Sequence, residues 1–150
     1  MNQARLSYEK PSLLDATFNR LFGWLVGLGL APSNFYLLQV RGRKSGRIYS
    51  TPVDLLVQAG KRYLVSPRGY TQWMRNAKAS GTVTLKRGRT VEQYTVREVS
   101  TQQKPEILKA YLDTYKSQVQ RFFPVPAGSP AEAFVSLAER YPAFELTPVE

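Results

Sequence analysis

Apolar residues recur at every third or fourth position through residues 12–30, and this spacing predicts a helix. Ser12 is a suitable N-cap for that helix. The stripe on its apolar face consists of Leu14, Phe18, Leu21, Leu25 and Leu28. We therefore predict an N-terminal amphipathic helix that packs on the core, with contact to a lipid surface as the alternative.

Runs of aromatic and aliphatic residues between glycine-containing turns predict strands in the rest of the chain. The predicted strands cover residues 35–40, 48–58, 62–66, 82–85, 90–99 and 144–148. Pro52 predicts an edge position or a bulge near the start of the second strand. The connections 42–46, 59–61 and 86–89 have the length of hairpin turns, so we expect an antiparallel sheet.

Three more helices are predicted among these strands, over residues 71–80, 104–119 and 131–141. Gly81 follows the first of them as a C-cap. One apolar stripe of the second consists of Leu108, Leu112, Tyr115, Val119 and Phe122. The pattern as a whole predicts a single α+β domain over residues 1–150, in which about six mostly antiparallel strands close into a small barrel with flanking helices.

The composition narrows the chemistry that this domain can perform. The chain has no cysteine and no histidine, which excludes disulfides, thiolate nucleophiles, catalytic triads and proton transfer by imidazole. Its 11 acidic residues are scattered, so we expect no metal site. If the protein is an enzyme, a cofactor is expected to supply the reactive chemistry.

The net charge of +10 is concentrated in the middle of the sequence. Residues 41–99 hold 13 lysines and arginines against 3 acidic residues, whereas the segments on either side are close to neutral. Such a field attracts phosphates, nucleic acid, anionic lipid or a polyanionic ligand.

The sharpest candidate for an anion site is the basic turn over residues 41–47. Its two glycines allow a tight turn that exposes backbone N–H groups, while Arg43 and Lys44 add charge and Ser45 adds a hydroxyl donor. A solvated surface turn has the same composition, so both interpretations stay open at this point.

Two further groups of residues could line a pocket. In residues 66–77, Trp73 offers a flat apolar face and Arg75 and Asn76 offer hydrogen-bond donors, although the tryptophan could equally anchor a short helix. On the later helix, Tyr111 and Tyr115 belong either to the core or to a site in which a tyrosine hydroxyl orients a substrate or relays a proton.

These motifs in combination resemble the deazaflavin-dependent nitroreductase family, whose members are split β-barrel flavin and deazaflavin oxidoreductases. The resemblance is carried by LLQVRGRKSG at 37–46, Ser50-Thr51-Pro52, RYLVS at 62–66 with Gly69, the segment 73–76 and YPAFEL at 141–146. The chain departs from the pattern at Tyr49, where the family often has arginine, and at Pro67, where some members have lysine.

The resemblance implies coenzyme F-420, a deazaflavin with a phosphodiester and a polyglutamate tail, and leaves FMN as the alternative cofactor. The residues that it implies for cofactor binding are Arg43, Lys44, Ser45, Gly46, Thr51, Pro52, Ser66, Arg68, Gly69, Trp73, Arg75 and Asn76. It also implies a substrate site lined by Tyr111, Tyr115 and Phe122, with Tyr115 as the catalytic residue.

The function expected from the resemblance is hydride transfer from reduced coenzyme F-420 to a small apolar acceptor such as a quinone, a nitroaromatic compound or an activated alkene. An FMN-binding reductase of the same fold and a non-catalytic basic barrel that binds nucleic acid or anionic lipid are the alternatives. We expect no metal and no nucleic-acid partner, a monomer or homodimer, and a cytoplasmic location with peripheral contact to the inner face of the cell membrane through residues 12–30.

Overall fold

The computed structural model describes residues 34–149, so the predicted helix over residues 12–30 lies outside the described part. Within it, seven strands form one sheet in which every hydrogen-bonded pair is antiparallel. The strands are β1 (Phe35–Arg41), β2 (Ile48–Asp54), β3 (Leu56–Gln58), β4 (Lys61–Val65), β5 (Thr82–Arg87), β6 (Thr90–Glu98) and β7 (Ala143–Pro148). The predicted α+β class and antiparallel sheet are confirmed, with seven strands in place of about six.

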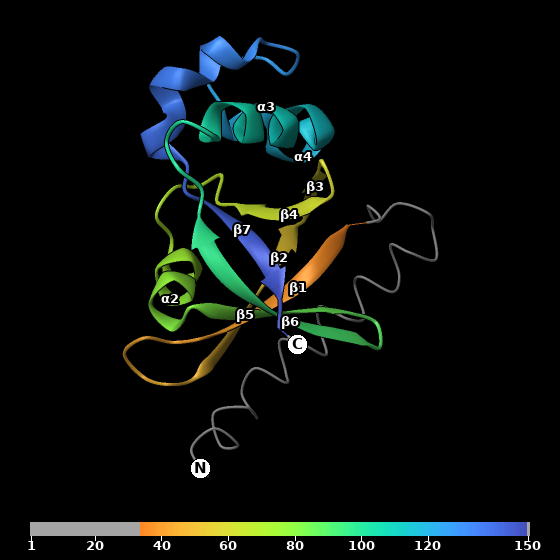
Figure 1. Ribbon diagram of the computed structural model, residues 1–150, viewed down its shortest axis with the longest axis vertical. Helices are drawn as coiled ribbons and strands as arrows, with labels where there is room; N and C mark the ends of the chain where they lie inside the picture. The colour runs from red at the N-terminus through yellow and green to blue at the C-terminus, as the bar shows by residue number, and fades with distance from the viewer. Residues whose placement is uncertain (1–33, 150) are drawn as a thin grey trace.

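The sheet is curled into an incompletely closed barrel (Figure 1). Its strand order is β2-β1-β5-β6-β7-β4-β3, so β2 and β3 are the two edges. The same two strands are consecutive in the chain and are separated only by Leu55. The edges of the sheet therefore meet at one residue, where the polypeptide itself joins them.

The prediction of one continuous strand over residues 48–58 is wrong, because the chain leaves the ladder at Leu55. The amide of Leu55 donates to the carbonyl of Asn34 (2.8 Å), and its carbonyl accepts a hydrogen bond from the hydroxyl of Tyr115. Both backbone groups are thus satisfied outside the sheet, and the buried Leu55 side chain packs in the barrel interior. β2 pairs with β1, whereas β3 turns to pair with β4.

The basic hairpin between β5 and β6 is tighter than predicted. Lys86 and Arg87 belong to β5, and only Gly88 and Arg89 form the turn. Gly88 has a φ of +59°, which a two-residue hairpin turn requires and which glycine adopts without strain. The strand prediction therefore ended β5 two residues early.

The helices confirm one prediction and correct two. α2 (Gln72–Ser80) ends at Gly81, which has a φ of +81° and donates its amide to the carbonyl of Ala77, as a C-cap does. The predicted helix 104–119 is broken into α3 (Lys104–Thr114) and α4 (Lys116–Val119), followed by the 3₁₀ turn η1 (Gln120–Phe122). The predicted helix 131–141 is a 3₁₀ segment, η2 (Ala131–Arg140).

The core has two parts, one on each side of the strands next to Leu55. The barrel interior holds apolar residues of β1, β4, β5, β7 and α2, including Leu38, Leu64 and Phe144. The second cluster joins α3, α4 and η2 to β3 and β4, and Figure 1 shows these helices stacked over those two strands. No helix among residues 34–149 has the length and apolar character needed to cross a membrane.

Candidate functional site

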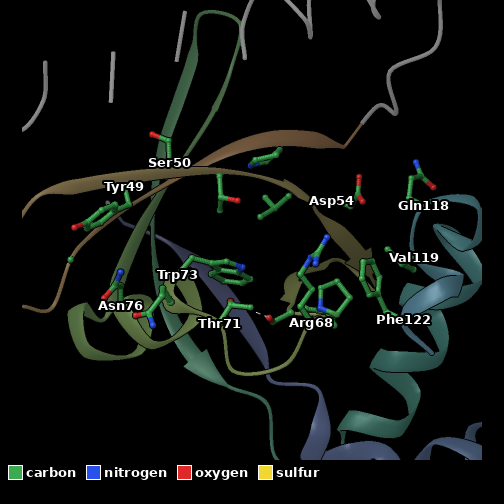
Figure 2. Close-up of a pocket in the computed structure, with 18 of the residues that line it drawn as sticks. Tyr49, Ser50, Asp54, Arg68, Thr71, Trp73, Asn76, Gln118, Val119 and Phe122 are labelled. Atoms are coloured by element: carbon green, nitrogen blue, oxygen red, sulfur yellow. Dashed lines mark hydrogen bonds between the residues drawn. The ribbon is translucent and has the colours of Figure 1, made fainter. Parts of the chain in front are cut away.

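A cavity of about 840 Å³ opens where the two core clusters meet. Its walls come from the turn after β1, from β2 between Tyr49 and Asp54, from the loop between β4 and α2, from the start of α2, and from the segment from α3 to η1. In Figure 2 the pocket runs from Tyr49 and Asn76 at one end to Asp54, Gln118 and Phe122 at the other, with Trp73 and Arg68 between them. We call these the turn end and the helix end.

The turn end is fixed by a contact between the basic turn and α2. The backbone amide and the guanidinium of Arg43 both donate to Oδ1 of Asn76, at 3.1 and 2.7 Å. This pair of hydrogen bonds holds the turn against the helix and leaves Lys44 and Ser45 beside it on the pocket wall. The two motifs that the sequence presented separately, the basic turn and the Trp-x-x-Asn segment, are thus parts of one wall.

Gly42 allows a close approach between this turn and Tyr49. A Cβ on Gly42 would lie 2.5 Å from the ring of Tyr49, which is far inside van der Waals contact. The hydroxyl of Tyr49 lies 3.2 Å from that of Ser45. Tyr49, the residue that departs from the resemblance, therefore packs on the turn and completes the pocket wall there.

The loop between β4 and α2 is held by Ser66, whose side chain is fully buried. Its hydroxyl donates to the carbonyl of Gly69 (2.5 Å) and lies 3.4 Å from that of Thr71. Gly69 has a φ of +91°, a conformation suited to glycine, so the loop can double back across the pocket. Ser66 lines the cavity, but the proton of its hydroxyl is committed to the loop.

Two arginines surround Phe122 at the helix end. The guanidinium carbon of Arg68 lies 4.8 Å from the ring centroid of Phe122, and that of Arg121 lies 4.7 Å from it. A cation at this distance from an aromatic ring is attracted by the ring's quadrupole. These contacts hold Arg68 in the pocket lining, where Figure 2 shows it between Trp73 and Phe122.

Tyr111 in α3 and Tyr115 just after it have different positions. Tyr111 is buried and lines the inner wall, and burial raises the pKa of its hydroxyl. Tyr115 is buried as well, but it does not line the cavity, and its hydroxyl donates to the carbonyl of Leu55. The structure therefore does not bring Tyr115 into the pocket, and its predicted catalytic role has no support in this geometry.

Asp54 stands at the helix end as the last residue of β2. Burial raises the pKa of its carboxyl from 3.8 to about 6. Its Oδ1 is a buried side-chain oxygen without a hydrogen-bond partner within residues 34–149. Buried polar groups are nearly always paired, so an orphaned oxygen in a cavity is a functional signal.

Most of the predicted site residues are brought together by the fold. Those that line the cavity are Arg43, Lys44, Ser45, Thr51, Pro52, Ser66, Arg68, Trp73, Asn76, Tyr111 and Phe122. Those that do not are Gly46, Gly69, Arg75 and Tyr115. The two glycines shape the adjoining turns with positive φ, and Arg75 is turned away because its Nε donates to the carbonyl of Tyr70 (3.0 Å).

Sequence reasoning missed Asp54, Gln118 and Arg121. Asp54 did carry a signal, because it is a lone acidic residue inside an apolar strand of the most basic segment. Gln118 and Arg121 carried none, since they reach the pocket only through the break in the helix at Tyr115.

The lining has the chemistry of a site for a large anion with an apolar end. It contains four cations, Arg43, Lys44, Arg68 and Arg121, against the single carboxylate of Asp54. Pro52, Val53, Trp73 and Phe122 supply apolar surface. Within residues 34–149 no group of acidic side chains is placed to hold a metal ion.

Comparison with known proteins gives one family match. The model of the F420H(2)-dependent quinone reductase family matches residues 14–126. This match favours coenzyme F-420 over FMN. No curated protein matches the sequence significantly.

Solved structures share the fold at low sequence identity. An F420-H2 dependent reductase (FDR-A) is 21% identical, with a TM-score of 0.51, over 77% of this chain and 95% of its own. A domain-swapped dimer is 19% identical, with a TM-score of 0.52, over 93% and 99%. The Atu2129 protein of Agrobacterium tumefaciens, of unknown function, is 15% identical with a TM-score of 0.55, over 77% of this chain and 48% of its own, so the chain spans about half of its length.

Proposed function

The chain belongs to the F420H(2)-dependent quinone reductase family, and from this membership we propose that it transfers a hydride from reduced coenzyme F-420 to a small apolar acceptor. The acceptor is a quinone, a nitroaromatic compound or an activated alkene. The observation that carries the proposal is the cavity that joins the cationic turn to the aromatic surfaces of Trp73 and Phe122.

The residues of the cavity fit the coenzyme. Arg43 and Lys44 supply positive charge at the turn end for the phosphate or the glutamate tail, and Arg68 supplies it at the loop. Trp73 and Pro52 offer flat apolar surface for the deazaflavin ring. A charged tail and a planar ring need these two kinds of surface in one continuous site, and this pocket provides both.

The protein and the coenzyme have different roles in the proposed reaction. The coenzyme supplies the hydride when it is bound. The protein binds and orients both partners, and the apolar residues around Tyr111 and Phe122 exclude water from the acceptor. Neither histidine nor cysteine is needed for this chemistry.

A double substitution at the basic turn tests the proposal. Arg43→Ala with Lys44→Ala should weaken coenzyme binding at least tenfold, because each charge-assisted contact contributes about 1.5–3 kcal/mol. The affinity is measured by titration of coenzyme fluorescence. Thermal unfolding of each variant shows whether loss of the Arg43–Asn76 contact has disturbed the fold, and Lys44→Ala alone avoids that contact.

The matched control is Arg89→Ala with Lys116→Ala, which removes the same charge from positions outside the pocket lining. It should leave the affinity within about twofold of the unmodified protein. Equal affinity of the turn variant and the control would exclude the basic turn from the site.

A homodimer belongs to the same proposal. It is supported by the similar structure that is a domain-swapped dimer and by the position of β2 at an edge of the sheet formed by residues 34–149. Light scattering of the full chain should give about twice the mass of 17.0 kDa. A monomeric mass over the micromolar range would contradict it.

A further inference from the structure

Asp54 is a polar group that the binding of the coenzyme does not explain. It lies at the helix end of the cavity, beside the kink at Leu55 and in the region of Gln118 and Phe122 (Figure 2). The four lining cations suit an anionic coenzyme, but a carboxylate repels one. Within residues 34–149, Asp54 forms no salt bridge, and its Oδ1 accepts no hydrogen bond.

Asp54 is better suited to donate a proton at neutral pH than the titratable groups around it. Tyr111 of α3 and Tyr115, which lies between α3 and α4, interact with it electrostatically, and burial raises the pKa of each hydroxyl above its ordinary value near 10. The Tyr115 hydroxyl is also committed to the Leu55 carbonyl. Arg68 and Arg121, which are cations, line the same end. Burial instead brings the pKa of Asp54 to about 6, within the working range of an acid at neutral pH.

We propose that Asp54 is the proton donor to an acceptor whose reduction places negative charge on a carbonyl oxygen, as in quinones and enones. This inference rests on the proposed function. When a hydride adds to such an acceptor, it brings two electrons and one hydrogen, and negative charge develops on the carbonyl oxygen. The O–H bond of Asp54 breaks, a new O–H bond forms on that oxygen, and the resulting carboxylate regains a proton from water.

The protonated form of Asp54 is the active one, for two reasons. It holds the proton that the acceptor needs, and it is neutral, whereas the carboxylate would repel the developing oxyanion. Reduction of a conjugated carbonyl should therefore slow as pH rises through about 6. The electrons come only from the hydride donor, so no further reductant is required.

A titration without coenzyme tests the acid directly. The chain has three aspartates, Asp15, Asp54 and Asp113, so protein labelled with ¹³C at the aspartate carboxyls gives three signals. The signal that is lost in Asp54→Asn should titrate near pH 6, and the signal lost in Asp113→Asn should titrate below the usual range, because Lys109 donates to that carboxylate. Titration of the Asp54 signal near pH 4 would overturn the proposal.

Steady-state kinetics tests the step itself. In the unmodified protein, kcat/KM for a quinone should fall about tenfold per pH unit above pH 6. Asp54→Asn should lower it about 10²-fold at pH 6 and flatten the profile, while coenzyme affinity does not fall, and Asp113→Asn should behave as the unmodified protein.

The outcomes separate this inference from the function on which it rests. If the unmodified protein oxidises the reduced coenzyme with a quinone but Asp54→Asn keeps both rate and pH profile, Asp54 is not the proton donor and the function stands. If the unmodified protein neither binds nor oxidises the coenzyme, the function fails and the inference fails with it.

Discussion

The hydroxyl of Tyr115 connects the helical segment to the kink in the sheet. It is buried and donates to the carbonyl of Leu55, the residue at which the edges of the barrel meet. The carbonyl of Leu55 lies outside the strand ladder, so this hydroxyl satisfies an acceptor that the sheet leaves open.

Removing that hydroxyl should therefore affect stability more than chemistry. Tyr115→Phe is expected to lower the free energy of unfolding by about 1–2 kcal/mol, because a buried carbonyl loses its partner. Urea denaturation measures the loss, and Tyr70→Phe, at an exposed tyrosine, serves as the control with a change below about 0.5 kcal/mol. An unchanged stability together with a large fall in turnover would restore Tyr115 as a catalytic residue.

Asp54 should make the fold less stable at neutral pH than at acidic pH. Burial raises the pKa of this carboxyl in the folded state from 3.8 to about 6, so the native protein binds the proton more tightly than the unfolded chain does. The free energy of unfolding contributed by this group thus falls as pH rises from about 4 to 6. Asp54→Asn, neutral throughout, should be more stable than the unmodified protein at pH 7.5 by about 1–2 kcal/mol, after allowance for the partial exposure of the site.

The comparison is made by urea denaturation at pH 7.5 and pH 4.5, and the gain should shrink at the lower pH. Asp113→Asn is the control with the opposite sign, because Lys109 lowers the pKa of Asp113 and removing the charge loses a favourable contact. A gain in Asp54→Asn that does not depend on pH would mean that packing, and not burial of charge, is the cause.

Among single residues, the sequence indicated the cations of the pocket better than its carboxylate. Arg43, Lys44 and Trp73 stand in motifs whose composition already suggests a ligand, and each lines the cavity. The different positions of Tyr111 and Tyr115 were not predictable, because both lie on the same apolar stripe of the sequence. Their surroundings differ only because the helix ends at Thr114.

At the scale of elements, α2 depends on its last position. Gly81 has a φ of +81°, and a Cβ there would meet no atom within 4 Å, so the cost of another residue is conformational and not steric. Gly81→Ala should therefore lower the free energy of unfolding by about 1 kcal/mol. Because asparagine tolerates this conformation better, Gly81→Asn should cost less, and thermal or urea unfolding of the pair checks the order. Equal losses would contradict a conformational origin.

The elements that the sequence predicted well are those set by local chemistry. Gly81 ended α2 as expected, and Gly88 placed the β5–β6 turn within the predicted connection. The break at Leu55 was invisible, because residues 55–57 continue the apolar strand pattern and the partners that divide it, Asn34 and Tyr115, are distant in sequence. The 3₁₀ geometry of η2 was missed because buried residues three and four apart, Phe134, Leu137 and Ala138, fit an α-helix equally well.

At the scale of the molecule, the charge of +10 should make coenzyme binding depend on salt. The Debye length falls from about 10 Å at 0.1 M to about 3 Å at 1 M, so a polyanion held by several cations is released as salt is added. Fluorescence titration at a series of salt concentrations should show the affinity falling steadily, with a shallower slope in the variant that lacks Arg43 and Lys44. Affinity that does not respond to salt would show that the ring, and not the charged tail, supplies the binding energy.

The overall architecture was accessible from the sequence because most of the sheet is built from short hairpins. The connections β1–β2, β3–β4 and β5–β6 are all local, and their turn residues can be read directly. The long-range strand pairs could not be predicted from local sequence. They are β5 with β1, and β7 with β6 and β4, and they depend on how the apolar faces are buried together.

The position of β7 determines when the sheet can be completed during synthesis of the chain. In the described sheet, β7 joins two groups of strands. One group is β2-β1-β5-β6, and the other is β4-β3. During synthesis, residues 35–98 can therefore form these two groups of paired strands, which are connected through Leu55. The groups cannot join into one sheet until residues 143–148 have been translated. Interruption of translation before that point would leave both inner edges, at β6 and β4, as open templates for pairing with another nascent chain.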